Sequence, residues 1–267
     1  MGVMEQYLNL GEFYDCDALR PLKPRVMEMT HTYKTLYTRA YDCINAAHGV
    51  MGDISAHIVD ENVIAAVKKR TRGIIAREIG KRHIGHNASA NASVPKVTHR
   101  FLSAFTYKGQ VARFDTVDAL AGRIYHLDNQ LGLAHTMLSD LLEAATAAGL
   151  DCIVCPSPMD PERLEHLFIL PLDLAFLSSN HQIQYEGPSY RHIRLDAMAN
   201  SERLKRCKAR IRFSKKVFAL LIDEAVRTLD EAKTLHDTLE QLINPHIDFD
   251  GVYDLAEYHL QLLLDKL

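Results

Sequence analysis

The sequence predicts an α/β protein, in which a parallel sheet flanked by helices is accompanied by two long helices that look like copies of each other. Three observations lead to this prediction. Apolar stripes with a seven-residue period lie toward both ends of the chain, strand-like and helix-like segments alternate over residues 96–195, and 267 residues are enough for one large domain or two small ones.

The composition narrows the class of protein. The chain is 47% hydrophobic and 24% charged with a net charge of −3, so its bulk charge does not indicate a nucleic-acid or membrane partner. Its five cysteines are scattered and odd in number, as expected for reduced thiols. Without an apolar run of about 18 residues or a signal-peptide pattern, we expect a cytoplasmic protein with no membrane partner.

One of the two long helices is predicted near the C-terminus. Apolar residues recur there every seven positions, from Leu204 to Leu239, with companions three or four residues later. This pattern predicts one helix over about 201–243. Asn200 or Ser201 can cap its start, and Asn244-Pro245 ends it.

The same stripe occurs 185 positions earlier, where Leu19 matches Leu204 and Ile54 matches Leu239. Prolines confine this helix to a start near Pro24. A short strand-like segment precedes each long helix, and a shorter helix follows each, at 61–79 and 250–267. The chain is therefore interpreted as an internal duplication of helical hairpins whose stripes pack on each other or on a common sheet.

The stretch after the first hairpin contains His83-Ile84-Gly85-His86, the adenylate-binding tetrapeptide of class I aminoacyl-tRNA synthetases. That motif needs a strand before it and a helix after it. Here it follows a helix that Gly80 can cap and precedes a run rich in Asn, Ala and Ser that ends at Pro95. We interpret 83–95 as a linker.

The segment 96–195 reads as an α/β module. Its expected elements are a strand at 123–127, a helix at 133–148, a strand at 150–155, a short helix at 161–166, and strands at 167–170 and 174–177. Alternation of this kind implies right-handed crossovers and a parallel sheet, with ligands bound at the carboxyl ends of the strands. The loop 128–136 joins the first strand to its helix, which is the position of a phosphate-binding P-loop, GxxxxGK[ST].

The module resembles the second half of an uncharacterised family of bacterial tandem P-loop ATPases. The resemblance rests on the order strand, loop and helix, followed by the segments at 150–155, 159–166, 169–176 and 178–180, and residues 8–15 resemble the tail of the first domain. It implies a P-loop NTPase-like fold. The domains expected are a helical region at 1–82 left from a lost first repeat, the linker, a degenerate P-loop core at 96–195, and long C-terminal helices at 196–267 that pack on the core.

The loop lacks the groups that phosphoryl transfer needs. A working P-loop uses glycines to expose backbone N–H groups, a lysine for the β- and γ-phosphates, and a hydroxyl for Mg²⁺. Here Leu133 or Ala134 stands at the lysine position, and Asp128 adds a carboxylate. Hydrolysis would need a lysine from elsewhere, with Lys96, Lys108 and Lys215 as unranked candidates.

Five residues are the candidates for binding a ligand at the loop and at neighbouring strand ends: Gly132, His135, Thr136, Asp160 and Asn180. The residues of the loop could hold ATP with Mg²⁺, although a loop histidine is also commonly just solvated. Asp160 heads an acidic cluster that could bind a substrate or a metal, and the plainer interpretation is an N-cap followed by the polar first turn of a short helix.

A pair of cysteines and two basic runs are further candidates for function. Cys152 and Cys155 form a CxxC on a strand, where positions i and i+3 point to opposite faces, so we expect buried thiols and no metal or redox site. Basic runs at 68–82 and 191–216 could bind nucleic acid, but no stacking aromatics accompany them, and a solvated face that pairs with acids explains them as well.

The sequence thus favours a pseudo-ATPase without catalytic residues, which acts through a protein partner, through a homo-oligomer formed by the long helices, or through a ligand held without hydrolysis. The first alternative is an active ATP-dependent enzyme with an atypical loop. The second is a nucleic-acid binder that uses its basic helix faces.

Overall fold

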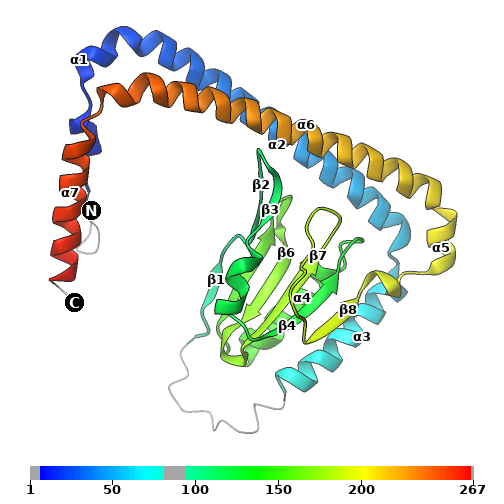
Figure 1. Cartoon of the computed structure of the whole chain (residues 1–267). Coiled ribbons are helices and arrows are strands. Elements are labelled where there is room, and N and C mark those ends of the chain that lie inside the picture. The colour runs from blue at the N-terminus through cyan, green and yellow to red at the C-terminus, as the bar shows by residue number, and fades with distance from the viewer. Residues whose placement is uncertain (1–6, 81–93, 266–267) are drawn as a thin grey trace. The chain divides into compact units, whose positions relative to one another are not determined.

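The structure is a computed structural model that describes residues 7–80 and 94–265. The chain forms two compact units, one from Met1–Arg39 with Thr228–Leu267 and one from Ala40–Arg227 (Figure 1). Two helices of 36 residues each, α2 (Lys23–Ile58) and α6 (Lys208–Ile243), pass through both units.

The larger unit contains a mixed, mostly parallel sheet of six strands in the order β1-β5-β6-β7-β4-β8. Pairs β1–β5, β4–β7 and β4–β8 are parallel, while β6 is antiparallel to both of its neighbours. A separate hairpin is formed by β2 and β3. The strands are β1 (Val97–His99), β2 (Ser103–Thr106), β3 (Gly109–Ala112), β4 (Arg123–Asp128), β5 (Cys152–Ser157), β6 (Asp160–Ile169), β7 (Leu174–Ser179) and β8 (Arg191–Arg194).

Strand β6 corrects two sequence-based predictions. Residues 161–166 do not form a helix, and Asp160 is not its N-cap, because the whole segment pairs with β5 across a tight turn at Pro158-Met159. The helix-like order of charges was misleading, since cross-strand pairing decides the conformation here. The prediction of an all-parallel sheet is therefore wrong, because β6 is antiparallel to both of its neighbours.

The helices agree closely with the predicted boundaries. They are α1 (Cys16–Leu19), α2, α3 (Glu61–Glu78), α4 (Ala134–Ala147), α5 (Ser201–Arg206), α6 and α7 (Phe249–Leu264), with 3₁₀ segments at Leu10–Phe13, Arg20–Leu22, Phe114–Ala119, Leu170–Leu172, Asp196–Met198 and Asn244–His246. Asn200 caps α5 by accepting the N–H groups of Glu202 and Arg203. The helix predicted over 201–243 is interrupted only at Cys207, between α5 and α6.

Elements at the two ends of the chain correspond one to one. Lys208 and Ile243, which bound α6, lie 185 positions after Lys23 and Ile58, which bound α2. A 3₁₀ segment and a short helix precede each long helix, and a helix of similar length follows each. The predicted strand before the first copy is wrong, because residues 8–10 are irregular up to the 3₁₀ turn that starts at Leu10.

The long helices pack antiparallel through the predicted stripes. In the larger unit, Ile44 and Ala47 of α2 form a buried cluster with Phe218, Ile222 and Ala225 of α6. The stripe residues are small or aliphatic, which lets the two helices approach each other closely. This confirms that the stripes are core.

The smaller unit is a helical assembly with few buried side chains. Within it, the ring of Tyr33 on α2 lies edge-on to His236 of α6, 5.5 Å away between centroids. The start of α7 is joined to the N-terminal segment, because the N–H of Asp248 donates to the carbonyl of Phe13. A side chain at Gly251 would collide with the Phe13 ring, so close packing there requires glycine.

A hydrophobic core covers each face of the sheet, and side chains along a strand alternate between the two cores. Tyr125 and Leu127 of β4 belong to the main core, with α3 and α4, whereas Ile124 lies in the second core on the other face with Leu177 and Tyr185. The alternation along β4 places His126 and Asp128 on the same face as Ile124.

A buried ionic network joins α3 to β4. Tyr125 donates its hydroxyl hydrogen to Oε1 of Glu78 at 2.6 Å, and Arg123 donates to Oε2 at 2.8 Å. Arg77 donates to the Tyr125 oxygen at 2.8 Å. Burial opposes ionisation of Glu78, but hydrogen bonds from Tyr125, Arg123 and Arg77 outweigh it and lower the pKa of the carboxyl group. Burial and Glu78 together raise the pKa of Tyr125 to about 12.

This network predicts an acid-sensitive contribution to stability. Because the pKa of Glu78 is lower in the folded chain than in the unfolded chain, its contribution is present above about pH 4.3 and is lost as the pH falls through the folded pKa. Replacement of Glu78 by Gln should lower the free energy of unfolding by about 1–3 kcal/mol at pH 7. Urea denaturation followed by circular dichroism at pH 7 and pH 3 should show the two proteins converging at the lower pH. An equal difference at both pH values would contradict this assignment.

Candidate functional site

The loop between β4 and α4 lies at the carboxyl end of an interior parallel strand, where α/β sheets bind ligands. The chain turns at Gly132, whose φ of +70° is in the left-handed region that favours glycine. Asn129 accepts the N–H of Ala134 through Oδ1 at 2.8 Å and so occupies a donor at the start of α4. The loop has the location of a P-loop, with a different set of polar contacts.

A carboxylate of the chain itself takes the backbone donors of the loop. Asp196, in the 3₁₀ turn after β8, accepts the N–H of Gln130 at 2.8 Å and the N–H of Leu131 at 2.9 Å. These donors lie in the loop whose N–H groups would cradle a phosphate in a working P-loop. Burial raises the pKa of Asp196; the two N–H donors and Lys215 act in the opposite direction, without reversing the shift.

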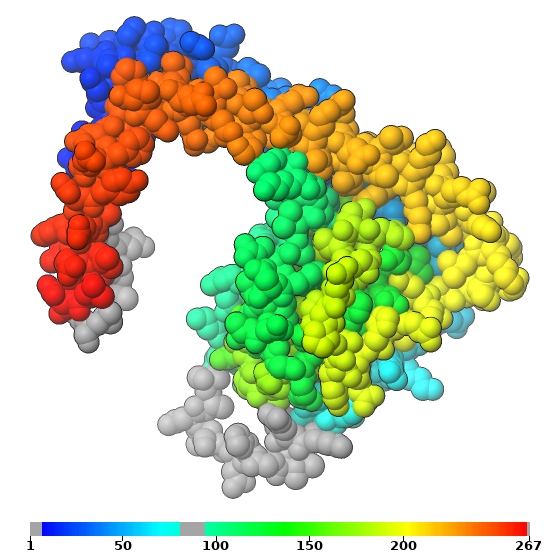
Figure 2. All heavy atoms as spheres, viewed as in Figure 1, coloured from blue at the N-terminus to red at the C-terminus, as the bar shows by residue number. Residues whose placement is uncertain are grey.

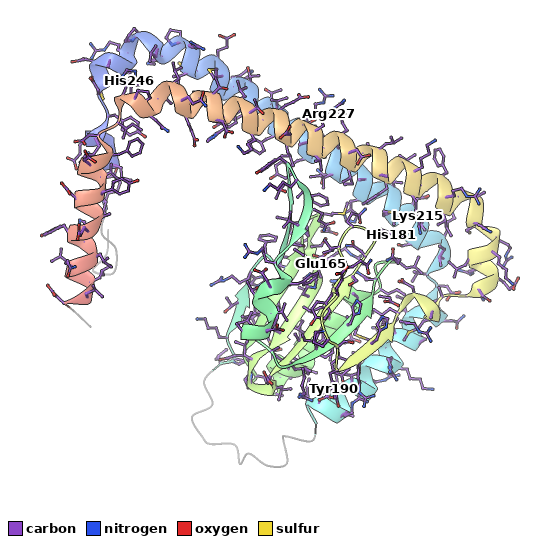
Figure 3. The ribbon with its side chains drawn as sticks, viewed as in Figure 1. Glu165, His181, Tyr190, Lys215, Arg227 and His246 are labelled. Atoms are coloured by element: carbon purple, nitrogen blue, oxygen red, sulfur yellow. The ribbon has the colours of Figure 1, made fainter. Side chains whose placement is uncertain are left out.

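Only one of the three candidate lysines lies at the loop. Lys215 of α6 lines a cavity of about 140 Å³ together with Gln130, Leu131 and Asp196. Figure 3 shows Lys215 beside His181, and burial together with the charge of Lys215 lowers the pKa of that histidine. Lys96 lies before β1, at the opposite end of the strands, and Lys108 lies in the turn of the β2–β3 hairpin.

A second cavity, of about 110 Å³, lies on the other side of the loop and brings together four of the five predicted residues. Its walls come from α2, the β4–α4 loop, α4, β5, β6 and the end of β7: His48, Asn129, Gly132, His135, Ser157, Met159, Asp160, Arg163, Leu164, Glu165 and Asn180. The fifth predicted residue, Thr136, lies in the first turn of α4 and is not among these lining residues.

His135 and Arg163 link the loop to β6. Nδ1 of His135 accepts the N–H of Leu164 at 3.0 Å, so the neutral ring carries its proton on Nε2. Burial and the nearby charge of Arg163 lower the pKa of His135, which keeps the ring neutral at pH 7. Arg163 donates to the carbonyl of Gly132 at 2.7 Å, so the cation that touches the loop is an arginine from β6.

The opposite wall carries an acid and an amide. His48 of α2 donates through Nδ1 to the carbonyl of Met159 at 3.3 Å, and its Nε2 lies 3.8 Å from Asp160. Asn180 uses its Oδ1 to accept the N–H groups of Gln182 and Ile183. Imidazole, guanidinium, carboxylate and amide groups therefore surround a space that suits a small polar molecule. It is well below the roughly 300–1,000 Å³ of common cofactor sites.

Glu165, which also lines this cavity, and the neighbouring His166 are bound to other strands. Glu165 accepts the hydroxyl hydrogen of Ser103 at 2.5 Å and lies 3.4 Å from Nε2 of His166. His166 is fully buried and accepts the N–H of Ser178 through Nδ1. These contacts hold the irregular part of β6 against the sheet.

The prediction that Cys152 and Cys155 are buried on opposite faces of a strand is confirmed. Cys152 lies in the main core and Cys155 in the second core, on opposite faces of the sheet. Burial raises the pKa of Cys152 to about 11 and that of Cys155 to about 12, so both thiols stay protonated at pH 7.

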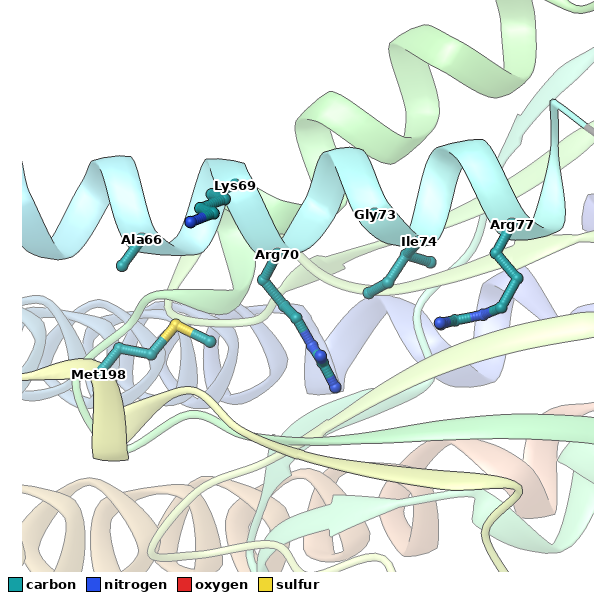
Figure 4. A pocket seen from close by; sticks show the side chains of 7 residues that line it. All are labelled: Ala66, Lys69, Arg70, Gly73, Ile74, Arg77 and Met198. Atoms are coloured by element: carbon teal, nitrogen blue, oxygen red, sulfur yellow. The ribbon is translucent and has the colours of Figure 1, made fainter.

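The basic residues of α3 line a shallow groove of about 390 Å³ (Figure 4). Arg70 and Arg77 extend toward the side on which Met198 lies, but Arg77 is already bound to Glu78 and Tyr125. This groove is larger than the cavity at the loop, yet its charge is partly neutralised. The tetrapeptide at 83–86 and most of the predicted linker lie outside the described residues.

Three residues at the loop could not be assigned from the sequence. Asp196 in the turn after β8 and Arg163 of β6 contact the loop, and His48 of α2 shares a cavity wall with it, although all three are far away along the chain. The only local signal was the position of Asp196 directly after a strand, where carboxyl-end residues gather.

Comparison with protein-family models, with curated proteins and with solved structures gives no match. Among the described helices, none is long and apolar enough to cross a membrane.

The raised pKa of Asp196 predicts a pH effect opposite to that of Glu78. The folded chain holds the Asp196 proton more tightly than the unfolded chain does, so stability decreases as the pH rises from about 3.9 through the folded pKa. Asp196→Asn keeps one of the two oxygen acceptors and does not ionise. The wild type should therefore lose stability between pH 4 and pH 7 relative to this variant. In urea denaturation, the free energy of unfolding of the variant minus that of the wild type should increase over that range. A relative decrease over that range would contradict the assignment, and Glu78→Gln serves as the variant expected to move the other way.

Proposed function

We propose that this protein is a pseudo-ATPase, a degenerate relative of tandem P-loop ATPases that acts by binding and does not hydrolyse nucleotide. The observation that carries the proposal is the carboxylate of Asp196 on the N–H groups of Gln130 and Leu131. A nucleotide phosphate would have to displace this internal anion. It would also meet Asp128 at the start of the loop, so repulsion opposes triphosphate binding.

The catalytic equipment supports the same conclusion. The first turn of α4 carries no lysine, Thr136 lies outside the wall of the 110 Å³ cavity, and that cavity is small for a nucleotide. Phosphoryl transfer depends almost entirely on positioned cations and donors around the γ-phosphate.

The equal lengths and constant offset of α2 and α6 support descent from a duplicated ancestor. Duplication of a helical hairpin would leave such a pair at the constant offset of 185 positions.

Association through helices is the proposed mode of action. Side chains of α7 are exposed at the surface of the smaller unit (Figure 2), including Tyr253 at 68% and Leu263 at 62%. None of the residues of α7 is buried. An apolar helix face of this kind is typical of a protein–protein contact.

Two observations favour the alternatives. Arg163 and Lys215 flank the loop and could supply positive charge to an atypical active enzyme. Lys69 and Arg70 on α3 offer a surface for nucleic acid. Each alternative predicts a distinct result, hydrolysis in the first case and salt-dependent binding of nucleic acid in the second.

Calorimetric titration of the whole chain with Mg-ATP should give no saturable heat, and the release of phosphate should not exceed that of a heat-denatured sample. Asp196→Ala should gain weak saturable binding of ATP or inorganic phosphate, because it frees two N–H donors next to Lys215. Adding Lys215→Gln to that variant should abolish the gain. Hydrolysis by the wild type that is lost in Arg163→Gln or Lys215→Gln would instead establish the active enzyme.

The helical contact predicts self-association. Light scattering after size exclusion at about 100 µM should give a mass above the 30.2 kDa of one chain. The double variant Leu260→Glu and Leu263→Glu should return the mass to that of one chain, because charge is costly in an apolar contact. Glu257→Gln, on the same helix, is the control that should leave the mass unchanged. A single-chain mass for the wild type would exclude the homo-oligomer.

A further inference from the structure

Three polar side chains meet at the edge of the sheet, and the proposed function uses only Asp128 among them. His126 and Asp128 are two positions apart on β4 and therefore project from the same face. His192 of β8 is the register partner of His126 in the parallel pair. One ligand atom of each residue lies within 4.8 Å of the others.

The contacts within this cluster are close. Nε2 of His192 lies 2.6 Å from Oδ1 of Asp128. The rings of His126 and His192 are stacked nearly parallel, with centroids 4.6 Å apart and an interplanar angle of 11°. An ion pair at the sheet edge would account for His192 and Asp128, but it does not explain a second imidazole stacked on the first.

We propose that His126, Asp128 and His192 form a binding site for a divalent transition-metal ion of the Zn²⁺ type. Two imidazole nitrogens and one carboxylate oxygen are ligands that Zn²⁺ prefers, whereas Mg²⁺ and Ca²⁺ prefer oxygen alone. Convergence on bonds of about 2.0–2.2 Å would use rotation about terminal side-chain torsions, which are soft.

The surroundings of the cluster support metal binding. Ser179 lies with its Oγ 2.7 Å from Nε2 of His126 and itself accepts the N–H of Tyr185, so it orients the imidazole as outer-shell groups do in metal sites.

The site is also open to solvent. The side chains of His192 and Asp128 are 45% and 32% exposed, so an ion can enter without a rearrangement of the core. Three protein ligands leave a tetrahedral ion with a free position, which is the arrangement of zinc sites that bind water or a substrate group. The inference rests on these three residues alone and is independent of the proposed pseudo-ATPase function.

The described residues contain one other cluster of this composition, on α6, formed by His236, Asp237 and Glu240. It has a single imidazole, which packs against Tyr33, and Asp237 is paired with Lys233. All three residues come from one stretch of a helix, and Glu240 is the exposed one among them. This cluster provides a matched control.

The test is calorimetric titration of the whole, untagged chain with ZnCl₂, combined with the visible spectrum of the Co²⁺-loaded protein. The wild type should bind one tight equivalent and show a Co²⁺ absorption band. His192→Ala should weaken Zn²⁺ binding at least about tenfold and remove the band, since even outer-shell changes cost about 10–100-fold. Because His192 is exposed, this variant should keep the circular dichroism spectrum of the wild type.

Asp128→Asn, at a half-buried position, should also weaken the binding of Zn²⁺. His236→Ala should leave both the affinity and the Co²⁺ band unchanged. If His192→Ala and Asp128→Asn bind Zn²⁺ within about twofold of the wild type, or if His236→Ala removes the tight equivalent, the proposed site is wrong.

Discussion

Strand β4 is hydrogen-bonded along both edges, to β7 and to β8. The Glu78 network, the cluster of His126, Asp128 and His192, and the β4–α4 loop all depend on this double pairing. It holds Tyr125 against Glu78 of α3, places His126 and Asp128 beside His192, and delivers the loop to the carboxyl edge of the sheet. Each contact requires the register of β4 to be correct, because a shift by one residue would exchange the two faces. The stability of the core and the candidate sites therefore share one structural element.

The loop after β4 has a turn and a helix start where a P-loop would have them, but side chains of the chain itself occupy its polar groups. Gly132 still turns the chain and α4 still begins at the expected place. Asp196 now satisfies two N–H groups of the loop, and Arg163 contacts its glycine carbonyl. Buried polar groups need partners, so once a carboxylate has taken these donors the loop is stable without a ligand.

The pKa values of Glu78 and Asp196 are shifted in opposite directions for one physical reason. Glu78 receives hydrogen bonds from two arginines and a tyrosine, which outweigh the cost of burial. Asp196 receives two backbone N–H groups, and burial outweighs them. The balance between desolvation and donors thus differs between the network that joins α3 to the sheet and the contact that closes the loop.

The sequence by itself determined the helices, the buried thiols and the α/β character of the chain. The stripes from Leu19 to Ile54 and from Leu204 to Leu239 predicted α2 and α6 because helical periodicity and caps are local signals. Four of the five predicted site residues meet in one cavity because strand ends gather at one edge of a sheet. Only the tertiary structure decided that β6 is a strand, that Asp196 and Arg163 reach the loop, and that His192 lies beside His126. These outcomes depend on strand order and register, which are set by non-local pairing that a local pattern does not encode.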